Sequence, residues 1–225
     1  MKFVMSYSCG KDSTLALHRM LAQGHEPVAL LTMVNREGGR SFFHGADEAM
    51  LRAYSQALGL PLLPVATAGE EYHLAMEASL RGAKALGAQA ACFGDIDLEG
   101  NRRWSEERCA HAGLNALFPL WQIGREEAVR ELLGLGYRCL IKSIQNTLLP
   151  EELLGRILDE DTLAVMERRG VDLCGENGEY HTLVVDGPIF RHPLPYRTDG
   201  ILRFGDHSLL AVSVEGTEES KKEKR

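Results

Sequence analysis

The 225-residue chain has an ordinary globular composition, with 44% hydrophobic and 25% charged side chains. This composition excludes a mostly disordered chain, and the length is enough to bury a complete core without disulfides or metals. Acidic residues outnumber basic ones by 32 to 25, and neither half of the chain has a basic excess. We therefore do not expect the chain to bind nucleic acid mainly through charge.

The sequence also indicates the compartment. No apolar run approaches the ~18 residues that span a bilayer, and the first residues become polar too early for a signal peptide. The five cysteines are scattered and include no C-x-x-C pair, unlike a disulfide framework or a zinc ribbon. We expect a cytoplasmic protein with reduced thiols and no membrane association.

In the first half of the chain, apolar strands alternate with amphipathic helices. Strands are predicted at residues 2–7, 27–34, 60–65 and 88–93, with an extended segment at 116–121. Helices are predicted from the end of a polar turn at 8–13 to Gly24, and at residues 49–58, 70–86 and 104–112. Buried strands joined by helices are typical of a parallel α/β sheet with right-handed crossovers.

The second half of the chain is less regular. Helices are predicted at 125–135 and 162–168, strands at 137–144 and 180–185, and a hairpin around 204–207. We therefore divide the chain into a sheet domain at 1–123, a smaller mixed α/β domain at 124–216, and a flexible tail at 217–225.

Three polar, glycine-bearing segments follow predicted strands, at residues 8–13, 35–45 and 94–97. The carboxyl ends of parallel strands lie at the same edge of a sheet, and ligands of such sheets bind there. The three segments are therefore expected to form one site.

The first of these segments, Ser-Cys-Gly-Lys-Asp-Ser, has the features of an anion site at the start of a helix. It is not a Walker A loop, because Met5 stands where that motif needs glycine and Asp12 follows Lys11. The alternative is a polar turn in which Asp12 or Ser13 caps the helix. The motifs of dinucleotide oxidoreductases, zincins and α/β-hydrolases are absent from the sequence.

The string S-x-G-K-D-S resembles the S-G-G-x-D-S PP-loop of the N-type ATP pyrophosphatases. With F-G-D-I at 93–96, P-L-W at 119–121 and G-E-N-G-E-Y-H-T at 175–182, the chain resembles the diphthine–ammonia ligase family, in its short prokaryotic form, over about residues 1–190. The resemblance implies a Rossmann-like parallel sheet with helices on both faces, of the PP-loop or HUP type. It also implies ATP and Mg²⁺ as cofactors.

The same resemblance implies the reaction. A substrate carboxylate attacks the α-phosphate of ATP, pyrophosphate leaves, and ammonia then displaces AMP to form an amide. The implied acceptor is a modified histidine of elongation factor 2, with a small carboxylic acid as the alternative. Two other functions stay open: a PP-loop enzyme acting on another small molecule or on tRNA, and a nucleotide-binding sensor without catalysis. The sequence does not decide whether the chain forms a homodimer.

The resemblance assigns the phosphate site. The residues that would hold the β- and γ-phosphates are Ser8, Gly10, Lys11 and Ser13. Lys11 would also act in catalysis, by neutralising charge on the leaving pyrophosphate. Asp12 is either the cap of the helix or an indirect ligand of Mg²⁺.

The base and metal sites are implied in the same way. Met33, at the end of the second strand, and His44 would border adenine and ribose, although His44 is otherwise an ordinary loop histidine. Gly94 belongs to the nucleotide site. Asp95 would bind Mg²⁺ and act in catalysis, since magnesium prefers oxygen ligands; the alternative is a turn aspartate.

Glu176 and Glu179 lie three residues apart in a turn, so both carboxylates are predicted to face one pocket. Carboxylates bind ammonium by charge, and one with a raised pKa can take its proton, so both are assigned to catalysis. The alternative is a solvated loop. The substrate site is assigned to Gly175, Gly178, Tyr180 and His181. Strand alternation should send only one of the last two toward the site, and we expect His181.

Cys9 stands where the PP-loop pattern more often has glycine. A positive φ at this residue would strain the backbone. The thiol is either an inert small side chain or a reactive group whose pKa is lowered by an electropositive phosphate site.

Overall fold

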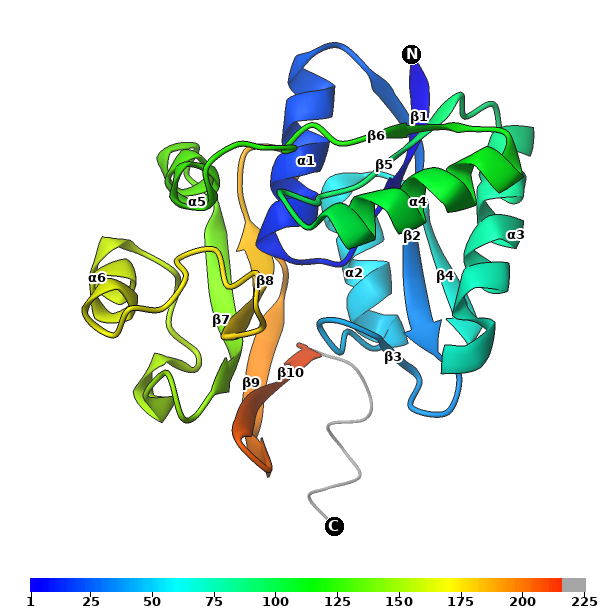
Figure 1. Ribbon diagram of the computed structural model, residues 1–225. Helices are drawn as coiled ribbons and strands as arrows, with labels where there is room; N and C mark the ends of the chain where they lie inside the picture. The colour runs from blue at the N-terminus through cyan, green and yellow to red at the C-terminus, as the bar shows by residue number, and fades with distance from the viewer. Residues whose placement is uncertain (216–225) are drawn as a thin grey trace.

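The structure is a computed structural model that describes residues 1–215 (Figure 1). The predicted tail, residues 217–225, lies outside these residues. Two sheets and the helices around them make up the fold. Sheet A contains β1 (Lys2–Ser6), β2 (Glu26–Asn35), β3 (Arg40–Ser41), β4 (Leu62–Thr67), β5 (Ala90–Cys92) and β6 (Asn115–Leu117). Its helices are α1 (Lys11–Ala22), α2 (Glu48–Leu58), α3 (Tyr72–Ala85) and α4 (Glu99–Ala112), with a 3-10 turn η1 (Gly69–Glu71) before α3.

Sheet A is parallel except for β3, as the alternation of strands and helices predicts. β2 pairs with β1 on one edge and with β4 on the other, because Leu30 and Leu31 pair with both strands. β1 then pairs with β5, and β5 with β6. The short antiparallel strand β3 lies inside the segment predicted to be a loop.

Side chains alternate across sheet A and bury both of its faces. Phe3 and Met5 of β1 join the core with α1 and α2, whereas Val4 joins the core with α3 and α4. The prediction of helices on both faces is therefore confirmed (Figure 1).

Several element boundaries differ from the prediction, and two of the differences have a clear physical reason. α4 begins at Glu99 rather than near Trp104 because its first residues are mostly exposed and show no apolar period. β4 runs to Thr67, and Pro64 is tolerated inside it because β4 is an edge strand that pairs only with β2.

Sheet B is antiparallel, in the order β8-β7-β10-β9. Its strands are β7 (Arg138–Gln145), β8 (Tyr180–Asp186), β9 (Tyr196–Phe204) and β10 (His207–Val214), and its helical elements are α5 (Arg125–Gly134), η2 (Glu151–Leu153) and α6 (Glu160–Arg168). Phe204 pairs with His207, so β9 and β10 form the predicted hairpin.

The two sheets share one core, with α1 and α2 between them (Figure 1). Tyr54 of α2 is fully buried, and its hydroxyl donates to the carbonyl of Val184 in β8 at 2.8 Å. The division at residue 123 stays a prediction. All five cysteines are free and buried, as their spacing predicts. Within residues 1–215, no helix has the length and apolar character needed to cross a membrane.

Candidate functional site

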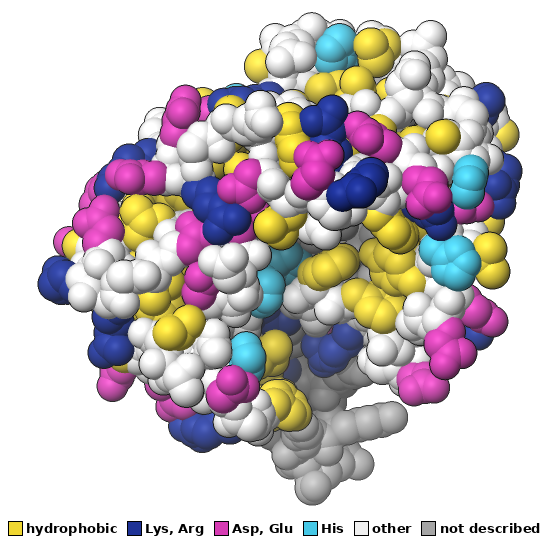
Figure 2. All heavy atoms as spheres, in the orientation of Figure 1, with side chains coloured by type: hydrophobic (Ala, Val, Ile, Leu, Met, Phe, Trp, Pro, Cys, Tyr) yellow, Lys and Arg dark blue, Asp and Glu magenta, His cyan; other side chains and the backbone are white. Residues whose placement is uncertain are grey.

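A cavity of about 650 Å³ lies where the carboxyl ends of β1 and β5 meet the start of β8. Figure 2 shows it as a hollow in the face of the molecule, with histidine side chains at its wall. All three polar segments that follow predicted strands contribute to its lining, through residues such as Ser8, His44 and Asp95. The prediction that these segments form one site is therefore confirmed in its geometry.

The segment 8–13 forms a tight loop before α1. Gly10 is the N-cap residue of α1, and the helix has no side-chain cap. The Ser8 and Ser13 hydroxyls lie 3.0 Å apart, and Ser13 donates to the carbonyl of Gly10 at 3.1 Å. The alternative in which Asp12 or Ser13 caps the helix is therefore wrong. Within residues 1–215, the N–H groups of Asp12 and Ser13 in the first turn of α1 are left for a ligand.

Lys11 places a cation at the floor of this cavity. Its side chain is only 7% exposed, and Nζ lies 2.7 Å from Asp12 Oδ2 and 5.7 Å from the centre of the Tyr180 ring. Burial alone would lower the pKa of Lys11, but the Asp12 carboxylate raises it well above its usual value. The backbone N–H of Lys11 donates to Thr182 Oγ1 at 3.3 Å, which ties the start of α1 to β8.

Cys9 has the strained backbone that its position predicts, with φ 72°. Its carbonyl accepts from the Val184 N–H at 3.0 Å and from the Tyr54 hydroxyl at 3.3 Å, so the strain is held by sheet B and α2. Burial raises the pKa of the Cys9 thiol well above its usual value. Since the thiol is also fully buried, the structure favours the inert side chain over the reactive group.

The strain at Cys9 leads to a stability prediction. Cys9→Gly and Cys9→Ala both remove the thiol, but only glycine adopts a left-handed conformation without penalty. We expect Cys9→Gly to be more stable than Cys9→Ala by about 1 kcal/mol in urea unfolding. Equal unfolding midpoints would show that the loop relaxes without strain.

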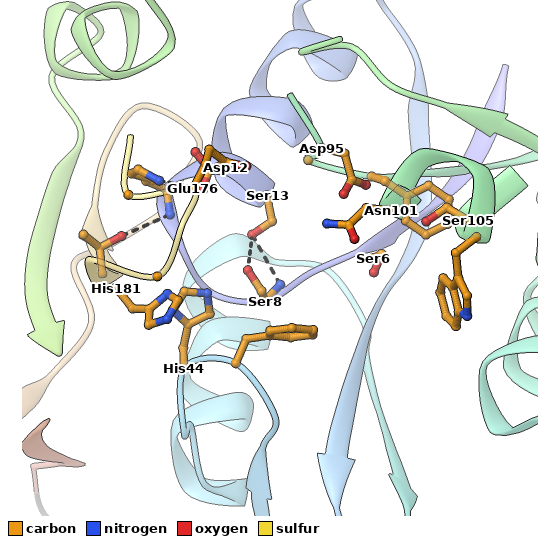
Figure 3. A pocket seen from close by; sticks show the side chains of 18 of the residues that line it. Ser6, Ser8, Asp12, Ser13, His44, Asp95, Asn101, Ser105, Glu176 and His181 are labelled. Carbon is orange, nitrogen blue, oxygen red and sulfur yellow. Dashed lines mark hydrogen bonds and ion pairs between the residues drawn. The ribbon is translucent and has the colours of Figure 1, made fainter. Parts of the chain in front are cut away.

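Acidic side chains lie on both sides of the serine pair. A carboxylate oxygen of Asp12, one of Glu176 and the Sγ of Cys174 all lie within 4.8 Å of one another. Figure 3 shows Asp12 and Glu176 on one side of Ser13 and Asp95 on the other. Burial, and next the charge of Asp12, raise the pKa of Glu176 to about 7. Burial also raises the pKa of Asp95, although a hydrogen bond with Asn101 lowers it in part.

The turn at 172–179 is built around Asp172, which accepts the N–H groups of Cys174 at 2.9 Å and Glu176 at 3.2 Å. Arg125 fixes this turn to the end of β5, because its guanidinium reaches Asp172 at 2.5 Å and Asp97 at 2.7 Å. Glu176 thereby lines the cavity.

The second predicted carboxylate of this turn, Glu179, does not line the cavity. It is buried and accepts the backbone N–H of Asn177 at 3.0 Å and its Nδ2 at 2.9 Å. The expectation that both carboxylates face one pocket is therefore wrong, because the turn at Gly178, with φ 88°, directs Glu179 back onto its own loop.

Tyr180 and His181 both line the cavity, contrary to the expectation that only one would. The Tyr180 ring lies under Lys11, and its hydroxyl donates to the carbonyl of Leu173 at 2.5 Å. Gly175 leaves the space for this ring, since a Cβ there would lie 2.9 Å from it. Burial and the charge of Lys11 lower the pKa of His181.

The remaining residues assigned to the nucleotide site line two different pockets. A Cβ on Gly10 would lie 2.6 Å from the His44 ring, so His44 packs directly on the loop 8–13. Met33 lines a smaller pocket of about 40 Å³ that shares Ser8 with the main cavity. Gly94 also lines the cavity, against the backbone of α1.

The far end of the cavity is aromatic, and sequence reasoning missed it. Phe43, Tyr72 and Trp104 line it, and the Tyr72 and Trp104 rings lie 5.8 Å apart. These residues come from three elements and form no motif. The cavity therefore joins a charged end, suited to a triphosphate, to an aromatic end, suited to a planar ring.

Comparisons with known proteins agree over most of the chain. The family model "Diphthamide synthase N-terminal domain" matches residues 1–116, and "Diphthamide synthase C-terminal domain" matches residues 124–207. Relatives named diphthine--ammonia ligase include one from Danio rerio, 27% identical over 85% of this chain and 84% of that protein. The Homo sapiens protein of that name is 26% identical over 85% of this chain and 81% of its own length.

A solved structure described as a predicted subunit of tRNA methyltransferase from Methanocaldococcus jannaschii aligns with a TM-score of 0.46 and 14% identity. It covers 86% of this chain and 100% of that chain. A likeness this weak says nothing about the activity of this chain.

Proposed function

The chain belongs to the diphthamide synthase family, and from this we propose that it is an ATP-dependent ligase that joins ammonia to a substrate carboxylate. The observation that carries the proposal is the cavity itself. It brings the cationic Lys11 and the N–H groups of Asp12 and Ser13 next to Glu176, a carboxylate whose pKa is raised to about 7. The names of the relatives support the same reaction class.

The phosphate end suits ATP cleavage between the α- and β-phosphates. Lys11, Ser8, Ser13 and the first N–H groups of α1 would bind the β- and γ-phosphates and stabilise the negative charge on the departing pyrophosphate. The carboxylate substrate attacks the α-phosphorus as the bond to pyrophosphate breaks. Positioning and charge stabilisation therefore account for most of the catalysis.

The cavity also fits Mg²⁺, because the Asp12 and Asp95 carboxylates offer the oxygen ligands that this ion prefers. The Cys174 thiol beside Asp12 is not such a ligand. When bound, Mg²⁺ would offset the negative charge of the triphosphate.

The acidic side of the cavity suits the nitrogen donor. Asp12 and Glu176 would attract ammonium by charge, and Glu176 would accept its proton to leave neutral ammonia. Ammonia then attacks the carbonyl carbon of the adenylated substrate, and AMP leaves. Diphthine is the acceptor that the names of the relatives suggest, and the sequence resemblance implies that it is carried by elongation factor 2. A half-buried carboxylate with a raised pKa, placed to take a proton, has no use in a nucleotide sensor, which favours the ligase over that alternative.

The products of the reaction test this proposal. Protein incubated with Mg·ATP, ammonium chloride and elongation factor 2 bearing diphthine should release AMP and pyrophosphate in equal amounts. Release should depend on the acceptor and on ammonium. Formation of ADP and phosphate, or tight ATP binding without any cleavage, would refute the ligase.

The raised pKa of Glu176 predicts a pH dependence. The carboxyl is protonated below pH about 7 and is a base above it, so the rate at limiting ammonium should rise through pH 7. Glu176→Gln should remove the inflection near pH 7, leave only the gradual rise that free ammonia shows with pH, and lower the rate on the order of 10²-fold. Glu179→Gln should instead lower the unfolding temperature and keep the pH profile, since Glu179 holds its own turn. A normal profile in Glu176→Gln would exclude Glu176 as the base.

A further inference from the structure

Lys142 is a buried lysine that the proposed reaction does not use. It lies on β7, and it is only 2% exposed. Its ammonium donates a hydrogen bond to the backbone carbonyl of His44, and within residues 1–215 it forms no ion pair with a carboxylate. Burial, and next the charge of Arg40, lower the pKa of Lys142 to about 8. Burying a cation that a carbonyl holds is unfavourable for folding, because the ammonium loses its hydration without gaining an ion pair. An apolar side chain would fill the same space without this cost.

The contacts around Lys142 make a specific bridge from sheet B to the segment that follows β3. Gly45 has φ 60°, and a Cβ there would lie 3.0 Å from Lys142 Nζ. The Arg40 guanidinium also donates to the carbonyl of Gly45 at 3.1 Å. Lys142 therefore fixes the position of His44 through its backbone.

His44, held in this way, lies beside the loop 8–13. Its ring is against Gly10, where even a methyl group would come within 2.6 Å of Cε1. The ring lies edge-on to His181 of β8, with centroids 5.3 Å apart (Figure 3). Nδ1 of His44 is buried and has no hydrogen-bond partner among the described residues. Unpaired buried nitrogens are rare in folded proteins. The residue that carries this one, His44, lines the cavity.

We propose that His44 contacts the triphosphate of ATP at the loop 8–13, and that Lys142 is the positioning residue that holds His44 there. The groups facing His44 are Lys11 from α1, His181 from β8 and Lys142 from β7. His44, Lys11 and His181 line the cavity. Lys142 does not line it and acts through the backbone carbonyl of His44. The proposal rests on ATP binding in the proposed function, but it is independent of the acceptor and of ammonia.

This arrangement predicts a loss that depends on the phosphates. AMP lacks the β- and γ-phosphates, so its binding should be insensitive to His44 and to Lys142. ATP and pyrophosphate should both depend on them. A merely structural role for Lys142 would weaken AMP and ATP alike, or would affect only the unfolding temperature.

The test compares dissociation constants of ATP, pyrophosphate and AMP, measured by calorimetry, for the wild type, His44→Ala, Lys142→Met and the double variant. Each single variant should weaken ATP and pyrophosphate about tenfold and AMP less than about twofold. The double variant should be no weaker than His44→Ala, because both changes remove one contact. Gly45→Ala, which crowds the ammonium and keeps β7 intact, should give the same pattern if Lys142→Met does not fold.

Unchanged ATP affinity in Lys142→Met or Gly45→Ala, equal losses for AMP and ATP, or additive losses in the double variant would each overturn the proposal. If the wild type binds neither ATP nor pyrophosphate, both the proposed function and the roles of His44 and Lys142 are refuted. If the wild type binds ATP and releases pyrophosphate while these variants bind normally, only the role of His44 and Lys142 is lost.

Discussion

Replacing Lys11 with methionine is expected to slow pyrophosphate release from ATP on the order of 10²–10³-fold. The substitution keeps most of the buried volume and removes the cation that faces the cavity. The charge matters most when pyrophosphate departs, so the turnover number should fall more than the affinity for ATP. The measurement is pyrophosphate release at saturating ATP, together with the dissociation constant of ATP.

A matched control separates this effect from a general loss of charge. Lys2→Met removes an exposed ammonium whose pairing with Glu26, at 3.9 Å, is weak. Its rate should match that of the wild type. The partner of Lys11, Asp12, has a side chain that is 28% exposed, so water can solvate it and Lys11→Met should still fold. A folded Lys11→Met protein with normal turnover would remove the loop 8–13 from the reaction.

Sheet A could be predicted because its signals are local. The strands predicted at residues 27–34 and 88–93 are both apolar on both faces. Glycines such as Gly24 and Gly59 mark the ends of the helices that connect the strands. The start of α4 could not be predicted, since its first turns lie on the surface and show no apolar period. The short strand β3 was missed because its pairing with β2 is a tertiary contact.

The contiguous part of the site was predictable for the same reason. Residues 8–13 form their loop within one stretch of sequence, and the strain at Cys9 follows from the place of that residue in it. Lys142 and Thr182 are different. Thr182 reaches this loop, and Lys142 reaches the carbonyl of His44, only when sheet B packs against the rest of the fold. No spacing in the sequence records that packing.

The orientation of Glu179 was beyond sequence reasoning as well. Two carboxylates three residues apart can face one pocket or opposite sides, and the backbone of the turn decides between them. Positive φ at Gly175 and Gly178 folds the turn so that Glu176 faces the cavity and Glu179 binds Asn177. This turn is held by its own Asp172, and Arg125, its tertiary partner, fixes its place in the fold.

Gly94→Ala is expected to lower turnover about 10²-fold and stability by about 1–3 kcal/mol. A Cβ at Gly94 would lie 2.8 Å from the Ser13 nitrogen and 2.9 Å from the Asp12 carbonyl carbon. Both are backbone atoms, so no side chain can move aside to make room. Either the segment after β5 or the first turn of α1 must shift, and the second choice moves the N–H groups that would bind phosphate.

Gly82→Ala provides the control for this prediction. Gly82 lies inside α3, and no heavy atom would lie within 4 Å of the added Cβ. Alanine should therefore stabilise the protein by about 0.5–1 kcal/mol and leave turnover unchanged. Gly94 has no positive φ, so any loss on substitution reports the close approach of two backbones rather than strain in one residue. If Gly94→Ala turned over normally, the end of β5 could move away from α1 without cost. The position of Asp95 relative to the loop 8–13 would then not matter for the reaction.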